Sequence, residues 1–247
     1  MTKSEEKIRI IHAPSDQEPF VVLEKARGLP TAPLSPGDES ALCEAEKIFP
    51  QIRLVAGKKE IEHGLVHRID TETAGLVLIA ATQEFFDFVS AAQKDGEFKK
   101  WYRAHVDVVP DIGKRLSGFP TFAPLEKSQS ICVKSRFRYF GSKNQEVRPV
   151  TESSGKAALK KCESKVYETK IDFDADQKKA VCQIASGFRH QVRSHLAMCG
   201  IPVRGDRLYN PNFREGERLC FEAFRLEFPR MGGGQFVFEI EGSGIAE

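Results

Sequence analysis

The sequence lacks the cysteine pattern of a zinc-binding or disulfide-stabilised protein. Its six cysteines are scattered along 247 residues and no two of them form a C-x-x-C pair, which argues against a structural zinc site and suits a reducing compartment. No apolar run approaches the length of a membrane span, and the first ten residues, MTKSEEKIRI, lack the apolar segment of a signal peptide. We therefore expect a cytoplasmic protein without a membrane partner.

Internal repeats and low-complexity segments are also absent, and neither sign of charge dominates the whole chain, whose net charge is +2. The charges are nevertheless unevenly distributed. Residues 1–112 carry 14 basic and 19 acidic side chains, residues 171–247 carry 10 and 11, and residues 113–170 carry 13 basic and only 5 acidic ones. Clustered lysine and arginine are typical of proteins that bind a phosphate backbone, but an ordinary solvated surface explains the charge equally well.

The chain does have enough apolar sequence for a core, since hydrophobic residues make up 40% of it. Apolar runs and turn signals predict strands over 8–13, 20–25, 75–82, 99–109, 131–140, 165–173 and 179–185, and a closing hairpin of 218–228 with 235–241. Helical spacing and caps predict helices over 39–49, 82–96 and 189–200. This irregular order predicts an α+β fold, not a doubly wound sheet, with residues 1–247 as a single domain.

The predicted strand 131–140, ICVKSRFRYF, has two different faces. Side chains alternate along a strand, so Lys134, Arg136 and Arg138 share one face. The apolar side chains fall on the other: Ile131, Val133, Phe137 and Tyr139. We call the three cations the basic stripe. If residues 113–170 bind a phosphate backbone, this stripe is the predicted contact surface.

The stretch HRIDTETAGLVLIA (67–80) places a carboxylate directly before an apolar strand. Asp70 has a plain structural interpretation as a turn residue that bonds nearby backbone N–H groups. It also has a functional interpretation as a nucleophile or base at a cleft, in which case it needs a cation partner to stay ionised. An aspartic-protease motif is excluded, because the sequence DTE lacks the glycine of that motif and has no second copy.

A second polar cluster lies in the segment SGFRHQVRSHLAMCGIPVRGDRLY (186–209). Arg189, His190 and Arg193 fall on neighbouring turns of the predicted helix there. These cations are candidates for the partner of Asp70, and a solvated basic helix face is the alternative.

The histidines do not predict a metal site. His63 and His67 have H-x-x-x-H spacing, but they lie in a predicted loop and lack the glutamate of a zinc-protease motif. His190 and His195 add no better ligand spacing. We therefore expect no metal.

Four segments resemble motifs of the RluA family of RNA pseudouridine synthases, in the family's order. GLVHRIDTETAGLVLIA (64–80) resembles the motif H-R-L-D-x-x-T-S-G-L, and residues 186–209 resemble G-R-T-H-Q-I-R-x-H followed by GD-x-x-Y. PFVVLEKARGLPTAP (19–33) is similar to the early K-P-x-G segment, and KKWYRAHV (99–106) to the K-x-Y-x-A-x-V strand. The resemblance runs from about residue 19 to about residue 228, and the ordered spacing makes it specific.

The resemblance implies a mixed, mostly antiparallel central sheet flanked by helices and loops around a catalytic cleft. Enzymes of this family detach a uracil from its ribose, rotate it and rejoin it through carbon 5, without a cofactor. The resemblance implies that Asp70 is the catalytic aspartate, acting as nucleophile or as base, and that Arg193 pairs with it. Tyr102 would stack on the target base and assist proton removal at carbon 5.

RNA, as a uridine-containing stem-loop of rRNA or tRNA, is the partner that the resemblance implies, and DNA is not expected. Arg68 would enter the RNA as the base leaves. The other residues expected to contact RNA are His67, Arg189, His190, Gln191 and the basic stripe of Lys134, Arg136 and Arg138.

The sequence departs from the family pattern outside these catalytic positions. Ala26 replaces the proline of K-P-x-G, Ala74 replaces the serine of T-S-G, and Asn210 replaces a final glycine. Phe188 and Arg189 stand where the family usually has Arg and Thr. Loss of that arginine removes a phosphate contact or a packing ion pair, for which Arg189 could substitute.

Fewer than about twenty residues precede the first matched segment, too few for the N-terminal RNA-binding domain of many relatives. We therefore expect a catalytic domain that binds RNA alone, as a monomer. A non-catalytic RNA-binding module on the same fold is the alternative, suggested by the substitutions at Ala74, Phe188 and Arg189. A metal-dependent hydrolase is a third hypothesis, which the poor ligand spacing does not favour.

Overall fold

The computed structural model describes residues 6–116, 118–120 and 122–241. Contacts divide this part of the chain into two compact units, one of residues 6–100 with 222–241 and one of residues 101–221. The chain passes from the first unit to the second between Lys100 and Trp101, within a strand. It returns between Phe221 and Glu222, at the start of another strand. The expectation of a single domain stays a prediction.

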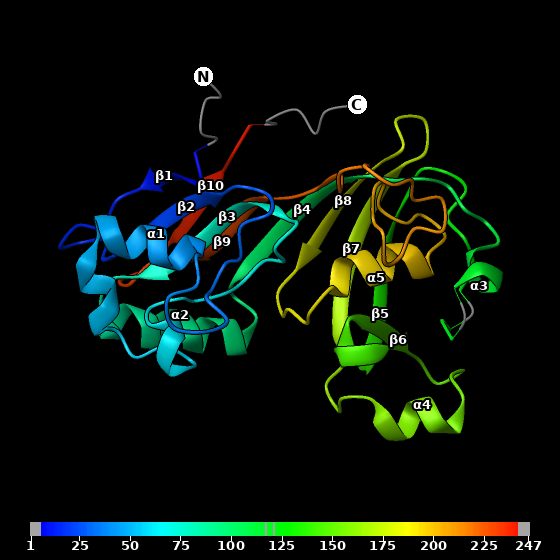
Figure 1. Ribbon diagram of the computed structural model, residues 1–247, viewed down its shortest axis with the longest axis horizontal. Coiled ribbons are helices and arrows are strands. Elements are labelled where there is room, and N and C mark those ends of the chain that lie inside the picture. The colour runs from blue at the N-terminus through cyan, green and yellow to red at the C-terminus, as the bar shows by residue number, and fades with distance from the viewer. Residues whose placement is uncertain (1–5, 117, 121, 242–247) are drawn as a thin grey trace. The chain divides into compact units, whose positions relative to one another are not determined.

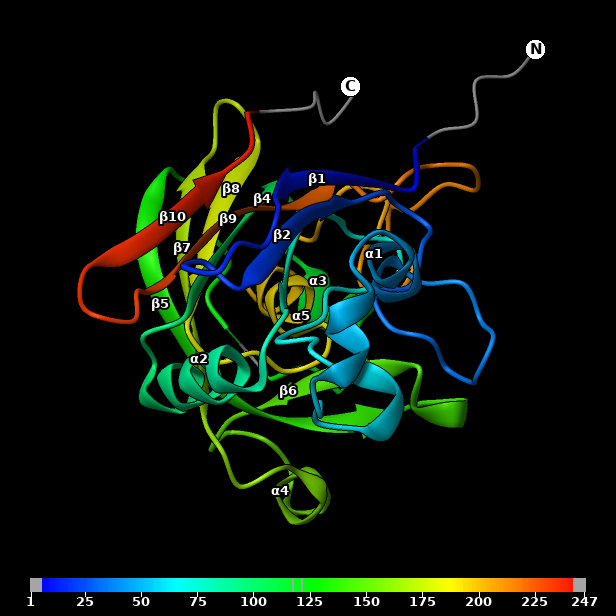
Figure 2. The same ribbon diagram turned by 90° about the vertical axis from the view of Figure 1, so that its left-hand side faces the viewer.

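In the first unit the strand order is β1-β2-β3-β9, and β10 pairs with β9 off this path. These strands are β1 (Ile8–His12), β2 (Phe20–Lys25), β3 (Ala74–Ala80), β9 (Phe221–Pro229) and β10 (Gln235–Glu239). β3 and β9 are parallel, and the other neighbours are antiparallel. The β9–β10 hairpin is the predicted closing hairpin, and its long turn is visible in Figure 2.

Helices α1 (Ala41–Ile48) and α2 (Gln83–Asp95) form beside this sheet (Figure 1), with short 3-10 turns η1 (Pro50–Leu54) and η2 (Glu60–Glu62) between them. Both helices were predicted from the sequence. Thr82 accepts a hydrogen bond from the Phe85 backbone N–H, and Gly96 ends α2 in the left-handed conformation, as N- and C-caps do. The core beneath them contains aromatic rings. Phe20, for example, stacks on Phe85 with 4.8 Å between the ring centroids.

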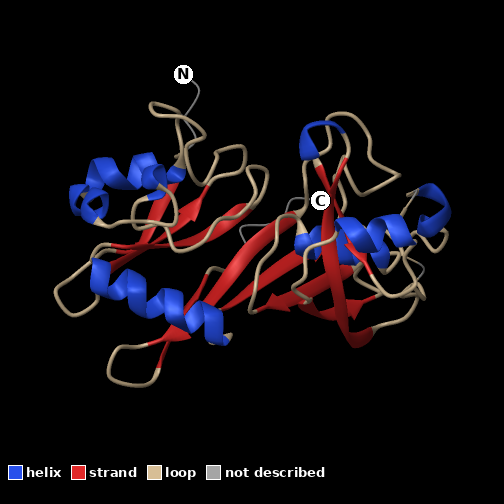
Figure 3. Ribbon diagram, turned by 90° about the horizontal axis from the view of Figure 1, so that it is seen from below, coloured by secondary structure: helices blue, strands red, loops and turns tan. Residues whose placement is uncertain are grey.

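The second unit contains a sheet with the order β4-β8-β7-β5-β6. Its strands are β4 (Lys99–His105), β5 (Gln129–Phe140), β6 (Glu146–Val150), β7 (Tyr167–Asp174) and β8 (Lys179–Ile184). β5 pairs with β6 and β7, and β7 with β8, all antiparallel. Strands predominate in both units, with helices beside them (Figure 3). The predicted α+β class with a mixed, mostly antiparallel sheet is confirmed.

The helices of the second unit are α3 (Ile112–Arg115), η3 (Ser142–Asn144), α4 (Lys156–Lys161) and α5 (Gln191–Met198). α5 was predicted, with the wider bounds 189–200. All eight residues of α5 are buried, so the alternative of a solvated basic face is wrong for Arg193. It holds for Arg189, which precedes the helix and is exposed. Side chains of α5 bond to the sheet: Ser194 donates to the Val147 carbonyl and His195 bonds to Ser135. No helix within the described ranges combines the length and apolar character needed to cross a lipid bilayer.

One local prediction was wrong. The strand predicted over 99–109 ends at His105, because the following backbone N–H groups of Asp107 and Val109 bond to carbonyls of Pro202 and Gly200 instead. α3, β6 and α4 were not predicted.

Candidate functional site

Asp70 lies half-buried in a turn that leads into β3. The Thr73 backbone N–H donates to the Asp70 carbonyl oxygen at 3.0 Å and closes the turn. The apolar strand that follows is buried from Gly75 onward, so the carboxylate is attached to a rigid element. The turn interpretation and the functional interpretation of Asp70 are therefore compatible.

A segment after β2 holds this turn from the other side. The Thr71 carbonyl accepts hydrogen bonds from Lys25 Nζ at 3.0 Å and from the Gly28 backbone N–H at 2.9 Å. Arg27 donates to the Glu72 carbonyl at 3.0 Å. Thr31 Oγ1 donates to the Ile69 carbonyl at 2.7 Å. We call residues 25–31 the turn clamp; every bond that it makes to residues 69–72 fixes the backbone on either side of Asp70.

Lys25 is the buried centre of the turn clamp. Its side chain has no exposed surface, and its Nζ also donates to the carbonyls of Ala26 and Leu29, at 2.9 and 2.7 Å. Burial lowers the pKa of Lys25 to about 7, although the nearby charge of Asp70 acts in the opposite direction. Lys25 thus holds the backbone of the turn by a hydrogen bond and interacts electrostatically with the Asp70 carboxylate.

The two residues that precede Ile69 differ in exposure. His67 is buried and accepts a hydrogen bond from the Leu78 backbone N–H. Burial and the charges of Lys100 and Lys58 hold the pKa of His67 well below its ordinary value, so it is a neutral acceptor that supports β3. Arg68 is exposed and donates to Glu62 at 2.9 Å. Its contact with RNA stays a prediction.

Tyr102 lies on β4 with 7% of its surface exposed. Its ring stacks on Phe221 at 5.1 Å with 6° between the ring planes. One face of the tyrosine is therefore covered by protein, and the predicted stacking of the ring on a base stays a prediction. Phe221 is a residue that the sequence motifs did not single out.

Arg193 lies on α5 in a buried, two-point ion pair with Asp206. Its Nε and an Nη donate to the two carboxylate oxygens at 2.7 and 2.8 Å. The same carboxylate accepts backbone N–H bonds from Leu208 and Tyr209. Such paired, charge-assisted bonds fix the plane of a guanidinium. The role of Asp206 was missed, although the GD-x-x-Y signal at residues 205–209 contains it. The predicted pairing of Arg193 with Asp70 concerns residues of different units and stays a prediction.

His190 and Gln191 serve the internal structure at the start of α5. His190 is buried with a left-handed backbone, and its Nδ1 lies 2.9 Å from the Tyr209 hydroxyl. Gln191 donates to the Glu168 carbonyl and to Thr169 Oγ1, and accepts from the Phe188 backbone N–H. Their predicted contact with RNA stays a prediction, and these bonds make both residues supports of α5.

The basic stripe has the predicted alternation. Along β5, Val133, Ser135 and Phe137 are buried, whereas Lys134 is exposed and Arg136 and Arg138 are half-buried. Lys134 forms an exposed ion pair with Glu168 at 3.1 Å. Arg138 lies over the Phe140 ring, and burial together with Arg148 lowers the pKa of its guanidinium.

Arg189 is exposed outside the stripe and donates to the Asn144 carbonyl at 3.0 Å. It therefore lies beside the β5–β6 turn. The stripe and Arg189 both belong to the second unit.

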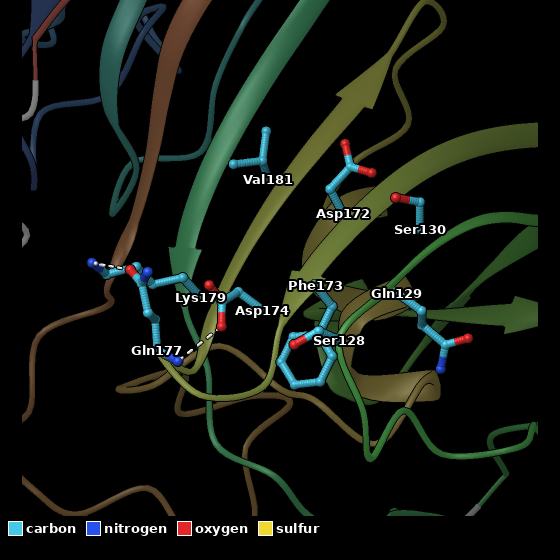
Figure 4. Close-up of a pocket in the computed structure, with 9 residues that line it drawn as sticks. All are labelled: Ser128, Gln129, Ser130, Asp172, Phe173, Asp174, Gln177, Lys179 and Val181. Carbon is cyan, nitrogen blue, oxygen red and sulfur yellow. Dashed lines mark hydrogen bonds between the residues drawn. The ribbon is translucent and has the colours of Figure 1, made fainter.

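No predicted catalytic residue lines the larger of two described hollows, of about 420 Å³, on the second unit (Figure 4). It is lined by Ser128, Gln129, Ser130, Asp172, Phe173, Asp174, Gln177, Lys179 and Val181. Within the described ranges, no group of three or more His, Cys, Asp or Glu side chains could hold a metal ion. His195 is buried between Ser135 and Thr169, to which its ring nitrogens bond, and burial lowers its pKa to about 3.

Comparisons with known proteins agree with the motif order. The sequence model of a family described as RNA pseudouridylate synthase matches residues 19–198. The chain is 29% identical over 163 residues to RNA pseudouridine synthase 7 of Arabidopsis thaliana, which is 63% of this chain and 37% of that protein. It is 24% identical over 234 residues to Ribosomal large subunit pseudouridine synthase D of Zymomonas mobilis, which is 93% of this chain and 66% of that protein.

A solved structure, Human RNA Pseudouridylate Synthase Domain Containing 1, has a similar fold. It covers 98% of this chain and 86% of its own, with a TM-score of 0.65 and 16% sequence identity. At that identity the likeness concerns the fold alone. The matched part of the chain spans about one third of the length of the Arabidopsis thaliana relative and about two thirds of that of the Zymomonas mobilis relative.

Proposed function

Because the chain belongs to the RNA pseudouridylate synthase family, we propose that it is an RNA pseudouridine synthase, an isomerase that converts uridine in structured RNA to pseudouridine. The membership confirms the resemblance to the RluA family described from the motifs. Relatives are named for both kinds of expected substrate, ribosomal RNA in Zymomonas mobilis and tRNA in Saccharomyces cerevisiae. The proposed partner is accordingly an rRNA or tRNA stem-loop.

The observation that carries this proposal is the support of the Asp70 turn. Four bonds from the turn clamp, including one from a buried lysine, fix the backbone on both sides of a half-buried carboxylate. A simple surface turn needs no such support, whereas a group that must meet the ribose–base unit of a bound uridine does. Asp70 is the proposed catalytic aspartate.

Tyr102 and Arg193 have complementary proposed roles. The uridine must leave the RNA stack to reach the site, at a cost of a few kcal/mol. Stacking of the base on the Tyr102 ring would return about 1–3 kcal/mol of this. Arg193, held in one plane by Asp206, would keep Asp70 ionised and oriented.

Mapping of pseudouridine in total cellular RNA tests the proposal. We would compare cells with the wild-type protein, cells without it, and cells with Asp70→Asn, which keeps the shape of the side chain but removes its charge. We expect the same one or few sites to lose pseudouridine in the deletion and in the variant. Asp95→Asn, at the exposed end of α2, is the matched control and should keep every site.

Two other outcomes would change the assignment. If sites disappear in the deletion but persist with Asp70→Asn, the protein is a synthase and Asp70 is not its catalytic group. If no site changes while the purified protein binds RNA, the proposal of an enzyme is wrong and the RNA-binding module is favoured.

A further inference from the structure

Four aromatic rings gather on the face of β5 opposite the basic stripe. Phe188 stacks on Phe137, with 5.2 Å between centroids and 5° between planes. The Phe188 ring also lies 5.5 Å from Tyr139 and 5.2 Å from Tyr167. Phe188 therefore joins the other three rings, and we call the four residues the aromatic cluster.

One side of the aromatic cluster is in the core and the other is at the surface. Phe137 has no exposed surface, whereas Tyr139 is 44% exposed. Tyr167 and Phe188 are half-buried, and Val166 beside Tyr167 is 53% exposed. A lone exposed apolar residue is ordinary, but a contiguous set of partly exposed rings is typical of a binding surface.

The rings are held in place before any ligand arrives. The backbone N–H of Phe188 donates to Gln191 at 2.9 Å, and Gln191 in turn donates to the Glu168 carbonyl of β7. Tyr139 lies directly opposite Val147 in the β5–β6 ladder. The surface is therefore preorganised, which reduces the entropy lost on binding.

Cations lie at two edges of the aromatic cluster. Lys165 Nζ is 5.4 Å from the centre of the Tyr167 ring and donates to Ser186 at 3.0 Å. The exposed Arg189 follows Phe188 in the chain and reaches Asn144 in the β5–β6 turn. Flat apolar rings with positive charges beside them match the chemistry of an unpaired nucleotide, whose base stacks and whose phosphate is an anion.

We propose that the aromatic cluster binds an unpaired base of the RNA by stacking on Tyr139, with Lys165 and Arg189 near its phosphates. The inference rests on the proposed function for the choice of RNA as the polymer. It also explains a departure from the family pattern, because Phe188 stands where the family usually has arginine. In this chain a ring that completes the stacking surface replaces that charge, and the neighbouring Arg189 supplies the cation.

The test is binding of a labelled, single-stranded ten-nucleotide oligouridine, compared with an RNA duplex of the same length. Tyr139→Leu keeps an apolar side chain but removes the ring. We expect it to weaken oligouridine binding about tenfold, as loss of one stacked base does, with little change for the duplex. The slope of affinity against salt should stay the same because no charge is removed. Tyr139→Phe keeps the ring and should bind like the wild type.

A fluorescence measurement reads the stacking directly. In Trp101→Phe, which removes the single natural tryptophan, Tyr139→Trp places the only indole in the aromatic cluster. We expect oligouridine to quench its emission, and the duplex to leave it unchanged. Val181→Trp in the same background, exposed on β8, is the control that should not respond.

The outcomes separate this inference from the proposed function. If Tyr139→Leu binds oligouridine like the wild type and the Tyr139→Trp emission is unchanged, the stacking surface is wrong, even where the cellular mapping shows an active synthase. If the emission is quenched and Tyr139→Leu binds weakly, the surface is supported, whether or not the mapping finds any pseudouridine. Failure of the wild-type protein to bind oligouridine overturns the inference.

Discussion

Lys25 shows how a single residue can couple the support of the site to pH. It is fully buried, and burial lowers its pKa to about 7 in the folded protein, against about 10.4 in an unfolded chain. Between these two values the unfolded state binds more protons than the folded state. The contribution of Lys25 to stability therefore increases as pH rises from 7 toward 10, and is lowest below pH 7.

We predict that this dependence disappears in Lys25→Met, whose side chain is also unbranched and only one heavy atom shorter but does not titrate. Urea unfolding at pH 7, 8 and 9 should show the wild type gaining on the variant by at most about 1.4 kcal/mol per pH unit. Lys94→Met, at the exposed end of α2, should show no such trend against the wild type. A difference between wild type and Lys25→Met that does not vary with pH would mean that the ammonium stays protonated on folding.

Among the structural elements, β3 depends on a glycine at its start. Gly75 has a φ of +122°, and a Cβ atom there would lie 2.1 Å from the carbonyl oxygen of Ala223 on the parallel strand β9. Gly28 in the turn clamp also has a positive φ, of +80°, but a Cβ there would meet nothing within 4 Å. An alanine at Gly28 would therefore introduce backbone strain alone, whereas an alanine at Gly75 would add a steric clash.

We predict that Gly28→Ala costs about 1–2 kcal/mol of unfolding free energy, the cost of left-handed backbone alone, and that Gly75→Ala costs clearly more. Denaturant unfolding of both variants measures the difference. Since Gly75 lies five residues after Asp70, pseudouridine formation should also fall more in Gly75→Ala. Equal losses of stability would show that β3 and β9 can separate at this point without cost.

The elements that the sequence predicted are those whose signals are local. Thr82 and Gly96 mark the ends of α2, and the alternation along 131–140 marks the two faces of β5. The end of β4 at His105 was not predictable, because it depends on carbonyls of Pro202 and Gly200, almost a hundred residues away. α5 contains the cation Arg193, yet all of its residues are buried, and side chains of the helix bond to partners on other elements.

The candidate site follows the same division. The position of Asp70 before a buried strand was evident from the pattern of residues 67–80. The motif resemblance implied roles for Tyr102 and Arg193. It did not indicate their immediate partners: Phe221, which is far from Tyr102 in the sequence, and Asp206, which lies beyond the helix that carries Arg193. The sequence showed Lys25 only as the lysine of the early motif. Its role in the Asp70 turn was not predictable, because Lys25 bonds to Thr71, 46 positions later in the sequence.

For the whole molecule, the distribution of charge has more consequence than its sum. The net charge of +2 conceals 13 basic against 5 acidic residues between 113 and 170. RNA binding releases counterions, so each phosphate contact adds about 0.7–0.9 to the slope of log affinity against log salt. The position of a lysine or arginine, not only its number, should therefore decide its effect on RNA affinity.

We predict that replacing Lys134, Arg136 and Arg138 together by Gln weakens RNA binding and lowers that slope by about 2–3. The exposed ion pair of Lys134 with Glu168 is worth little, so folding should persist. The matched control replaces Lys47, Lys59 and Lys94 by Gln, which removes the same charge from the acidic segment 1–112. Binding titrations between 50 and 200 mM salt, concentrations chosen from the range where such slopes are about linear, should separate the two triple variants. If both lose the same affinity and slope, the net charge alone governs binding and the basic stripe is an ordinary solvated face.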